Sequence, residues 1–323
     1  MDATIVIPTK NAGDILNRTL GMVFSQKTQF TYEVICVDSG SKDNTLEIIK
    51  QYPCILYEIP AQEFGHGKTR NYGASQGKGE FIVFITQDAA PAKEDWLEQL
   101  ILAVKSDDQI AGGFGIHYPY EDCNALDRVD LVRHFQNYGM ENTIFYIDDM
   151  EKFKNDNAYM QHLAFFSDNN SCIRRAVWQQ YPYPDVNFAE DQIWMRKMME
   201  KGYKKVYCPK APVYHSHNFK LSTYYKRFFD EYRGLYDVYG YIISDSWWSL
   251  PIHWAKHIRR DLANIRSQQM SRSRKLYWLG YSIIRNYCRY YGGYKGGMWH
   301  SFSPARQQRI DRRFSQQYKE KRA

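Results

Sequence analysis

The stretch FGHGKT, residues 64–69, ends with the three residues that close a phosphate-binding loop. A nucleotide triphosphatase needs the full spacing G-x-x-x-x-G-K-[ST], because the backbone N–H groups of that loop surround the phosphates. The position five residues before Gly67 holds Gln62 instead of glycine, and Pro60 interrupts any strand that would lead into the loop. The sequence therefore excludes a P-loop here, and these residues need another explanation.

Polar side chains follow three apolar runs that are typical of buried strands. Thr9 and Asn11 follow ATIVIP, Asp38 ends YEVICVD, and Gln87 and Asp88 follow EFIVFIT. An Asp at a strand end is often only a turn residue. Three such clusters in succession, however, favour a ligand site.

The runs between these clusters predict alternating strands and helices. After the first apolar run, Leu16, Leu20 and Val23 recur at helical spacing, and the apolar run that ends at Asp38 is followed by another helical pattern. Strands that are apolar throughout are expected in a mostly parallel sheet with helices on both faces. Such a sheet binds ligands beyond the carboxyl ends of its strands, where the polar clusters fall. The fold class is therefore α/β, and it lacks the G-x-G-x-x-G fingerprint of a dinucleotide-binding fold.

Composition narrows the class of protein further. The chain has 323 residues, 44% of them hydrophobic, as in a globular protein. Its six cysteines form no C-x-x-C pair, so we expect reduced thiols, not a disulfide framework or a zinc site. The N-terminus lacks the pattern of a secretory signal, and no apolar run reaches the roughly 18 residues of a membrane span. We expect a cytoplasmic protein.

The order of the motifs resembles glycosyltransferase family 2. The segments that carry the resemblance are IVIPTKNAGDILNRTL, EVICVDSGSKDNT, KTRNYGASQGKGEFIVFITQDA and FAEDQIW. Together they run from about Ala3 to about His217, two thirds of the chain. The resemblance implies the GT-A fold, which binds nucleotide sugars. FGHGKTRN combined with TQDA resembles the rhamnosyltransferase branch, which uses dTDP-L-rhamnose.

The resemblance also implies roles for individual residues. Asp38 matches the Asp that accepts the imide N–H of a pyrimidine base, and the planar fork of Arg70 suits a diphosphate or a base edge. In the EDQIW motif, Asp191 matches the general base of an inverting transfer, with Glu190 beside it at a helix start. The residues expected at the donor nucleotide are Pro8, Thr9, Asn11, Asp38, Ser39, Lys68, Arg70, Asn71 and Gln87.

The metal motif departs from the family pattern. Where the family commonly has D-x-D, this chain has Thr86, Gln87 and Asp88, so one carboxylate remains. His215 and His217 lie two residues apart at the end of a strand-like run, which points both to the same side. The family often has a histidine ligand near this point. We therefore expect Mn²⁺ or Mg²⁺ at Asp88 with His215, His217 or both, and a soft imidazole ligand favours Mn²⁺ over Ca²⁺.

The acceptor side is less well marked. Phe165 and Phe166 predict a strand, and the polar turn after it contains Asp168 and Asn169, which are candidates for binding acceptor hydroxyls. Residues 119–162 are mixed in composition and predict an insertion on the acceptor side.

The C-terminal third has a different charge from the rest of the chain. Residues 251–323 contain 17 Lys and Arg against three Asp and Glu, a formal charge of +14, whereas the whole chain carries +7. We expect a GT-A catalytic domain over 1–218 and a helical, basic, aromatic-rich region over 219–323. Trp and Tyr among basic residues favour the headgroup level of an anionic membrane, reached without spanning it.

The predicted function is an inverting glycosyltransferase, most simply a rhamnosyltransferase that extends a lipid-linked glycan of a bacterial surface polysaccharide, such as an O-antigen. A family 2 enzyme with another donor, such as a UDP-hexose, is the first alternative. A nucleic-acid-binding protein with a basic tail and a non-catalytic scaffold are the others, and the basic face is also a candidate for contact between subunits. The strand-end carboxylates favour the enzyme and leave nucleic acid outside the expected partners.

Overall fold

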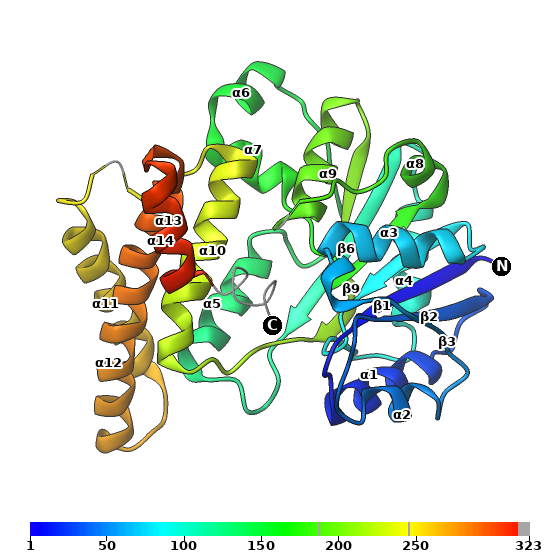
Figure 1. The fold of residues 1–323 in the computed structure, drawn as a ribbon, viewed down its shortest axis with the longest axis horizontal. Helices are drawn as coiled ribbons and strands as arrows, with labels where there is room; N and C mark the ends of the chain where they lie inside the picture. Colours follow the sequence, from blue (N-terminus) through cyan, green and yellow to red (C-terminus); the bar gives the residue numbers. More distant parts are fainter. Residues whose placement is uncertain (187, 245, 316–323) are drawn as a thin grey trace. The chain divides into compact units, whose positions relative to one another are not determined.

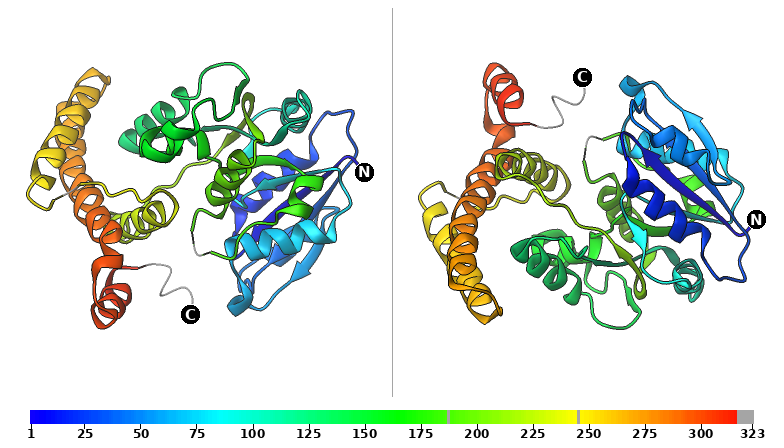
Figure 2. Two further views of the ribbon diagram at one scale, coloured as in Figure 1. Left: turned by 90° about the horizontal axis from the view of Figure 1, so that it is seen from above. Right: turned by 90° about the horizontal axis from the view of Figure 1, so that it is seen from below.

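The computed structural model describes residues 1–186, 188–244 and 246–315, and Figures 1 and 2 show its ribbon from three directions. Within these residues the strands are β1 (Ala3–Thr9), β2 (Tyr32–Asp38), β3 (Ile55–Glu58), β4 (Phe81–Ile85), β5 (Ala90–Pro91), β6 (Ile110–Tyr118), β7 (Thr143–Phe145), β8 (Asn170–Arg174) and β9 (Lys204–Tyr214). The helices of the first two thirds are α1 (Asp14–Phe24), α2 (Thr45–Ile49), the 3-10 turn η1 (Ala61–Glu63), α3 (His66–Gln76), α4 (Trp96–Lys105), α5 (Ala125–Gln136), α6 (Met150–Asn155), α7 (Asn157–Ala164), α8 (Arg175–Gln180) and α9 (Glu190–Glu200).

The remaining described chain is helical, as the sequence predicts. Its elements are α10 (Leu221–Tyr239), α11 (Leu250–Ser267), α12 (Arg272–Tyr287), the π-helical turn η2 (Cys288–Gly292), α13 (Gly293–Gly297), the 3-10 turn η3 (Trp299–Ser301) and α14 (Pro304–Phe314). No helix in the described part of the chain is both long enough and apolar enough to cross a membrane.

The chain divides into two compact units. The first contains residues 1–121, 131–186 and 190–216, and the second contains 122–130, the segment at 188–189 and the described residues from 217 onward. The predicted domain boundary at residue 218 stays a prediction. No sequence pattern predicts that residues 122–130 pack with the second unit.

The first unit is built on a mixed sheet of order β3-β2-β1-β4-β8-β6-β9-β5, with β7 beside β9. Strands β1 to β4 are parallel to one another, and β8 runs antiparallel to both β4 and β6. The predicted α/β class with a mostly parallel sheet is confirmed, although β5, β7 and β8 add antiparallel pairs. In this sheet the carboxyl ends of β1, β2 and β4 lie at one edge.

Helices cover both faces of this sheet. The periodic apolar residues of α1, α2 and α4 pack into one core with β1, β2 and β4 (Figure 1). Helix α3 lies on the other face and approaches β1 closely, since a Cβ on Gly73 would be 2.4 Å from Cγ1 of Val6. At the start of α3, a Cβ on Gly67 would be 2.3 Å from the carbonyl oxygen of Pro184. Gly67 of the FGHGKT segment is therefore required by close packing against Pro184, not by a phosphate-binding loop.

The second unit buries a cluster of ion pairs in addition to its apolar residues. Arg285 pairs with Asp127 and Asp130, and Arg289 and Arg260 also pair with Asp130. Burial alone would raise the pKa of Asp130, but the charges of Arg289 and Arg285 and their hydrogen bonds hold it far below its usual range. These ion pairs attach the 122–130 segment to α11, α12 and η2.

Candidate active site

The donor end of the site begins at the paired ends of β1 and β2, where Thr9 lies beside Asp38 in the parallel register. The Asp38 carboxylate is buried and accepts four hydrogen bonds. Oδ1 accepts from the backbone N–H groups of Gly40 (2.9 Å) and Ser41 (2.8 Å), and Oδ2 accepts from the hydroxyls of Thr9 (3.0 Å) and Ser41 (2.5 Å). Asp38 thus organises the turn after β2, and its contact with a base remains a prediction.

Side chains also join the loops that follow β1, β2 and β4. Oε1 of Gln87 accepts from the backbone N–H of Lys10 at 2.8 Å. Oδ1 of Asn11 accepts from the backbone N–H of Lys42 at 2.8 Å, and its own N–H donates to the hydroxyl of Ser41 at 2.8 Å. Asn11 has a φ of 46°, which the short polar side chain of asparagine tolerates well. Gln87, the middle residue of the altered metal motif, thus holds the first of these loops.

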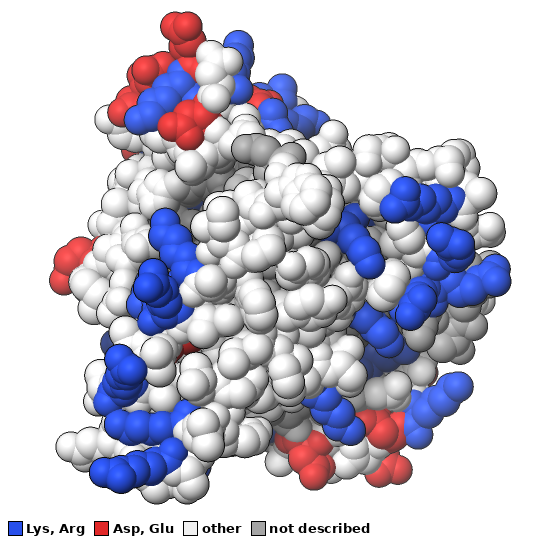
Figure 3. Space-filling view, turned by 90° about the vertical axis from the view of Figure 1, so that its left-hand side faces the viewer, with Lys and Arg blue, Asp and Glu red and all other residues white. Residues whose placement is uncertain are grey.

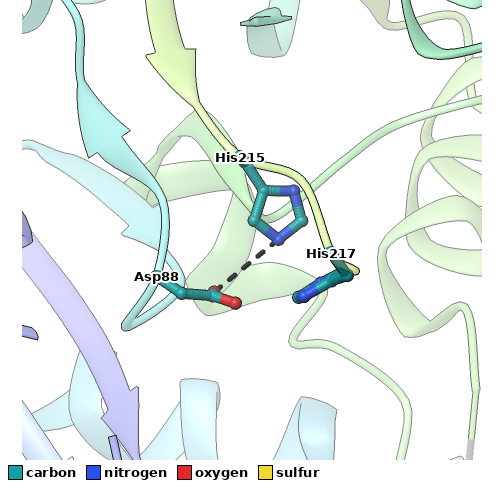
Figure 4. Close-up of side chains that lie close together, drawn as sticks. All are labelled: Asp88, His215 and His217. Atoms are coloured by element: carbon teal, nitrogen blue, oxygen red, sulfur yellow. Dashed lines mark ion pairs between the residues drawn. The ribbon is translucent and has the colours of Figure 1, made fainter. Parts of the chain in front are cut away.

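A second group lies where β9 ends beside β5 (Figure 4). Ligand atoms of Asp88, His215 and His217 all lie within 4.8 Å of one another, and Nε2 of His215 is 3.6 Å from Oδ1 of Asp88. The backbone N–H of His215 donates to the carbonyl of Tyr118, and the Tyr120 hydroxyl donates to the carbonyl of Asp88. His217 follows two residues later, where the chain leaves the first unit. The three residues predicted for the metal are therefore brought together.

The chemistry of this group fits a divalent ion. One carboxylate and two imidazoles suit Mn²⁺ or another transition ion better than Ca²⁺, and substrate phosphates commonly supply further oxygen ligands. The side chains of Asp88 and His215 are 24% and 11% exposed, so each is open enough for a ligand but shielded from bulk water. Behind them, the ring of His117 contacts that of His215 at 5.4 Å, and burial holds the pKa of His117 well below its usual value. His117 therefore stays uncharged beside the ligand group.

A buried carboxylate cluster forms the third part of the site. Glu190 and Asp191 open helix α9, and Asp168 lies in the turn before β8. Nη1 of Arg70 lies 2.6 Å from Oε1 of Glu190, and its Nε lies 3.4 Å from Oδ2 of Asp168. The backbone N–H of Asp168 donates to Oδ2 of Asp191 at 3.1 Å. One guanidinium thus faces three carboxyl groups.

This imbalance of charge changes the acidity of the cluster. Burial raises the pKa of Asp168 to about 6, even though Arg70 lowers it. Burial, followed by the charges of Glu190 and Asp168, raises the pKa of Asp191 well above its ordinary value. Glu190 and Asp168 raise the pKa of Arg70 against the opposing effect of burial. The guanidinium is therefore permanently charged, and the raised pKa values of Asp168 and Asp191 belong to two interacting groups that titrate together.

Helix α3 supports this cluster with a second side chain. Oδ1 of Asn71 accepts from Nε1 of Trp178 at 2.8 Å and from the backbone N–H of Tyr183 at 3.1 Å, and its Nδ2 donates to the Tyr183 carbonyl. The Tyr183 hydroxyl donates to Oδ1 of Asp168 at 2.9 Å. Arg70 and Asn71 are both predicted at the donor nucleotide. Arg70 contacts the carboxylate cluster directly and Asn71 contacts Tyr183, which holds Asp168, whereas Lys68 is exposed. Their donor contacts remain predictions.

The register of the sheet brings the metal-ligand group and the carboxylate cluster to one edge. Ile85 of β4 lies opposite Asn170 of β8, so the chain leaves β4 towards Asp88 at the same edge at which it enters β8 from Asp168. Asn169, the second acceptor candidate, is half-buried in the same turn. Pro8 and Ser39 lie at the ends of β1 and β2, where the backbone N–H of Ser39 donates to the Thr9 carbonyl.

Two contributors were missed by the sequence analysis. Ser41 connects Asp38 to Asn11, and Tyr183 connects α3 to Asp168. The serine has a detectable signal, because it lies three residues after an Asp at a strand end, a spacing that favours a hydrogen-bonded turn. Tyr183 lies in the segment QQYPYPD, which carries no periodic signal, so only the fold identifies it.

A sheet of this order, with carboxylates and histidines gathered at the carboxyl edge, is the architecture of a GT-A glycosyltransferase. The family model described as glycosyl transferase family 2 matches residues 4–182, and the chain belongs to this family. The chain is 33% identical over 234 residues to the O-antigen chain rhamnosyltransferase RfbN of Salmonella typhimurium, covering 71% of each chain. It is 34% identical over 231 residues to the O-antigen chain rhamnosyltransferase WbaN of Salmonella anatum, covering 70% of each.

Solved structures share the fold at lower identity. The mannosyltransferase PcManGT from Pyrobaculum calidifontis, in complex with GDP-Man and Mn²⁺, superimposes with a TM-score of 0.57 at 15% identity, over 93% of this chain and 88% of that one. TarS 1-349 of S. aureus gives a TM-score of 0.54 at 15% identity, over 95% of this chain and 77% of that one. These likenesses confirm the predicted GT-A fold, and the relatives establish that the chain is a glycosyltransferase.

Proposed function

We propose that this glycosyltransferase transfers L-rhamnose from dTDP-L-rhamnose to a glycan acceptor, with inversion at the anomeric carbon and with a divalent metal. The similarity to two O-antigen chain rhamnosyltransferases over about 70% of the chain supports the sugar. It also makes a UDP-hexose the weaker alternative, and it favours an enzyme over a nucleic-acid-binding protein or a non-catalytic scaffold.

The observation that carries the mechanism is the position of Asp191. Asp191 is a part-exposed residue, whereas Asp168, Glu190 and Arg70 beside it are buried, and the backbone N–H of Asp168 orients its carboxylate at 3.1 Å. In an inverting transfer, Asp191 takes the proton from the acceptor hydroxyl. The acceptor oxygen then bonds to the anomeric carbon as the bond from that carbon to the diphosphate oxygen breaks. A raised pKa makes Asp191 a stronger base once it is ionised.

Asp88, His215 and His217 would hold the metal ion. When bound, such an ion stabilises negative charge on a departing diphosphate. At the donor end, residues of this chain would bind the nucleotide and its diphosphate. The strand-end loops with Thr9, Asn11, Asp38 and Gln87 form a hydrogen-bonded frame for the nucleotide. Lys68 is exposed and suits the diphosphate charge.

Arg70, Asn71 and Tyr183 position the base. Arg70 fixes Glu190 and Asp168, and Asn71 holds the backbone of Tyr183, whose hydroxyl holds Asp168. Glu190 is buried against Arg70, so it acts through the cluster and not on the acceptor. Asp168 is 1% exposed, which leaves Asn169 as the better placed of the two acceptor candidates.

The acceptor proposed here is a lipid-linked glycan on the cytoplasmic face of a bacterial membrane, as in the synthesis of O-antigen chains. An enzyme that works on such an acceptor gains from binding the surface that carries it.

Turnover with purified protein tests the donor and the metal. Release of nucleoside diphosphate is measured with dTDP-L-rhamnose, UDP-glucose and UDP-N-acetylglucosamine, each with Mn²⁺, with Mg²⁺ and with EDTA. The proposal expects the highest kcat/KM for dTDP-L-rhamnose and loss of turnover in EDTA. Preference for a UDP-sugar overturns the donor, and full activity in EDTA overturns the metal. The anomeric configuration of the product, determined by NMR, tests inversion.

A further inference from the structure

Helix α12 has its apolar side outward. Its buried residues are polar, namely Ser282, Arg285 and Asn286, and Ser282 and Asn286 both donate to Oδ2 of Asp261 at 2.8 Å. Large apolar side chains occupy the exposed face instead: Leu276, Tyr277, Ile283, Ile284 and Tyr287. Leu276 is 71% exposed. A helix in a soluble protein normally buries its apolar stripe, so this arrangement calls for a partner.

The apolar face continues onto the start of α11. Trp247, Trp248 and Ile252 are exposed there, Trp248 at 70%. This end of α11 lies next to the end of α12, because Nε1 of Trp254 donates to the carbonyl of Ile283 at 3.0 Å. We call these eight exposed side chains the α11–α12 face: five on α12, Ile252 on α11, and Trp247 and Trp248 in the turn just before α11. Exposed apolar patches of this kind mark sites for proteins or membranes.

Basic side chains border this face, and acidic ones avoid it. The exposed basic residues of the two helices are Lys256, Arg259, Arg266, Arg272 and Arg274. The described residues 246–315 contain two acidic side chains: Asp261 is buried, and Asp311 is partly buried and paired with Arg233. Figure 3 looks onto the side of the molecule from which α11 and α12 are seen. Uncharged surface fills much of the view with Lys and Arg around it, and Asp and Glu are few and near the margins.

We propose that the α11–α12 face binds an anionic lipid surface, with α11 and α12 lying along it. Trp and Tyr side chains prefer the headgroup level, and each Lys or Arg near an anionic leaflet adds to the attraction. Apolar side chains of an interfacial helix enter only the boundary between headgroups and acyl chains, so no spanning helix is required. A second copy of this chain fits less well, because a symmetric contact would bring two basic rims together without acidic partners.

The face lies in the second unit and the proposed base Asp191 in the first, and none of the eight residues of the face is among those proposed for the donor, the metal or the acceptor. Lipid binding can therefore be tested separately from transfer. Failure of the lipid proposal would leave the proposed reaction standing, and the reverse also holds.

Flotation of the full-length protein with vesicles tests this proposal. At low salt, we expect the protein to float with phosphatidylcholine vesicles that contain phosphatidylglycerol. It should stay at the bottom with phosphatidylcholine alone, and 0.5 M NaCl should weaken binding. Leu276→Ser with Ile284→Ser should reduce binding at least about tenfold, since two apolar side chains are removed. Lys256→Glu, Arg259→Glu and Arg266→Glu together should reduce it at least about 100-fold.

Matched controls distinguish this face from general effects of charge and hydrophobicity. Met140→Ser removes an exposed apolar side chain elsewhere, and Lys50→Glu, Lys78→Glu and Lys154→Glu together change the charge by the same amount. Both controls should float like the wild type, and turnover with a water-soluble acceptor should be equal in all variants.

Three results would overturn the proposal. The first is that the wild type does not float with anionic vesicles at low salt. The second is that the control variants lose as much binding as the test variants. The third is that no protein floats and the wild type forms a dimer that Leu276→Ser with Ile284→Ser dissociates. The last result would assign the face to a second copy of the chain.

Discussion

Nη1 of Arg70 lies 2.6 Å from Oε1 of Glu190, and both side chains are buried. The ion pair connects the second turn of α3 to the first turn of α9, which also contains the proposed base, Asp191. Since Asp168 and Asp191 also face this guanidinium, its charge favours the ionised forms of these two carboxyl groups. Arg70 is thus a positioning residue: it holds Glu190 and Asp168 in place, and its charge stabilises the buried carboxylates.

Arg70→Met should destabilise the protein by about 3–5 kcal/mol, because it leaves buried carboxylates without their cation. Arg70→Lys keeps the charge but not the planar fork, so it should fold and show a smaller loss of stability. Urea denaturation measures both changes. Lys68→Met, two residues away on the exposed side of α3, is the matched control and should be close to the wild type. Equal stability of Arg70→Met and Lys68→Met would contradict this account.

Asp191→Asn should lower kcat by at least about 100-fold while the Kd for dTDP stays unchanged, because only the acceptor of the proton is lost. Single-turnover kinetics and calorimetry measure the two quantities. Glu200→Gln, at the exposed end of the same helix, is the control for a lost acidic residue and should retain full activity. Turnover of Asp191→Asn at the wild-type rate would mean that another group is the base.

Removal of a metal ligand should weaken the binding of dTDP only when the metal is present. Asp88→Ala should show the largest loss, because it removes the charged member of the group. His215→Ala and His217→Ala should each bind less tightly with Mn²⁺ and normally without it, whereas His253→Ala, an exposed histidine of α11, should behave as the wild type. Titration calorimetry with and without Mn²⁺ decides this. If both site histidines were silent, Asp88 would need other ligands.

The fold could be predicted well from this sequence because local and global signals agree. The apolar runs of β1, β2 and β4 and the periodic faces of α1 and α9 carry their own evidence, and Gly202 follows α9 with a φ of 88°. The strand predicted at Phe165 and Phe166 is wrong. Both residues follow α7, and the strand is β8 at Asn170–Arg174. Asn170 is buried and bonds to Trp96 at 2.8 Å, so a polar residue within a strand misled the prediction.

The residues of the candidate site could be proposed from the sequence, but the contacts between their side chains could not. The sequence motifs identify Asp88, Asp168 and Asp191 as candidates, because each lies next to the end of a strand or at the start of a helix. That Arg70 faces Glu190 and Asn71 faces Tyr183 depends on contacts 120 and 112 residues apart in the chain. Sequence patterns on one element contain no information about such contacts.

The pH dependence of stability should change in Asp168→Asn. The pKa of Asp168 is about 6 in the folded chain and about 3.9 in an unfolded one, so the folded state binds the proton more tightly. A raised carboxyl pKa contributes stability below about pH 4, and that contribution is lost as the pH rises to about 6. The loss amounts to roughly 3 kcal/mol for a shift of two units. Between pH 4 and 7 the wild type should therefore lose more stability than Asp168→Asn does.

Urea denaturation at several pH values measures this difference, since other carboxyl groups are common to both proteins. The acid limb of kcat/KM provides an independent measurement. The charge of Asp168 raises the pKa of Asp191, so the limb should move to lower pH in Asp168→Asn. Parallel stability curves together with an unmoved limb would show that Asp168 does not share a proton with the cluster.

Variants at Asp38 and Ser41 can distinguish a role of Asp38 in nucleotide binding from its role in stabilising the turn after β2. Its carboxylate already accepts four hydrogen bonds, which is all that its two oxygens offer. It can accept a base N–H only if one donor turns away, and the hydroxyls of Thr9 and Ser41 are the two donors that can rotate. Asp38→Ala should therefore lower the free energy of unfolding by about 1–3 kcal/mol and weaken dTDP binding at least about tenfold.

Ser41→Ala should also lower stability, but it frees one acceptor site on Oδ2 and should leave dTDP affinity equal or higher. Calorimetry and thermal denaturation of both variants are the measurements. If Asp38→Ala melts earlier yet binds dTDP like the wild type, the carboxylate holds the turn alone and the base is recognised by other groups.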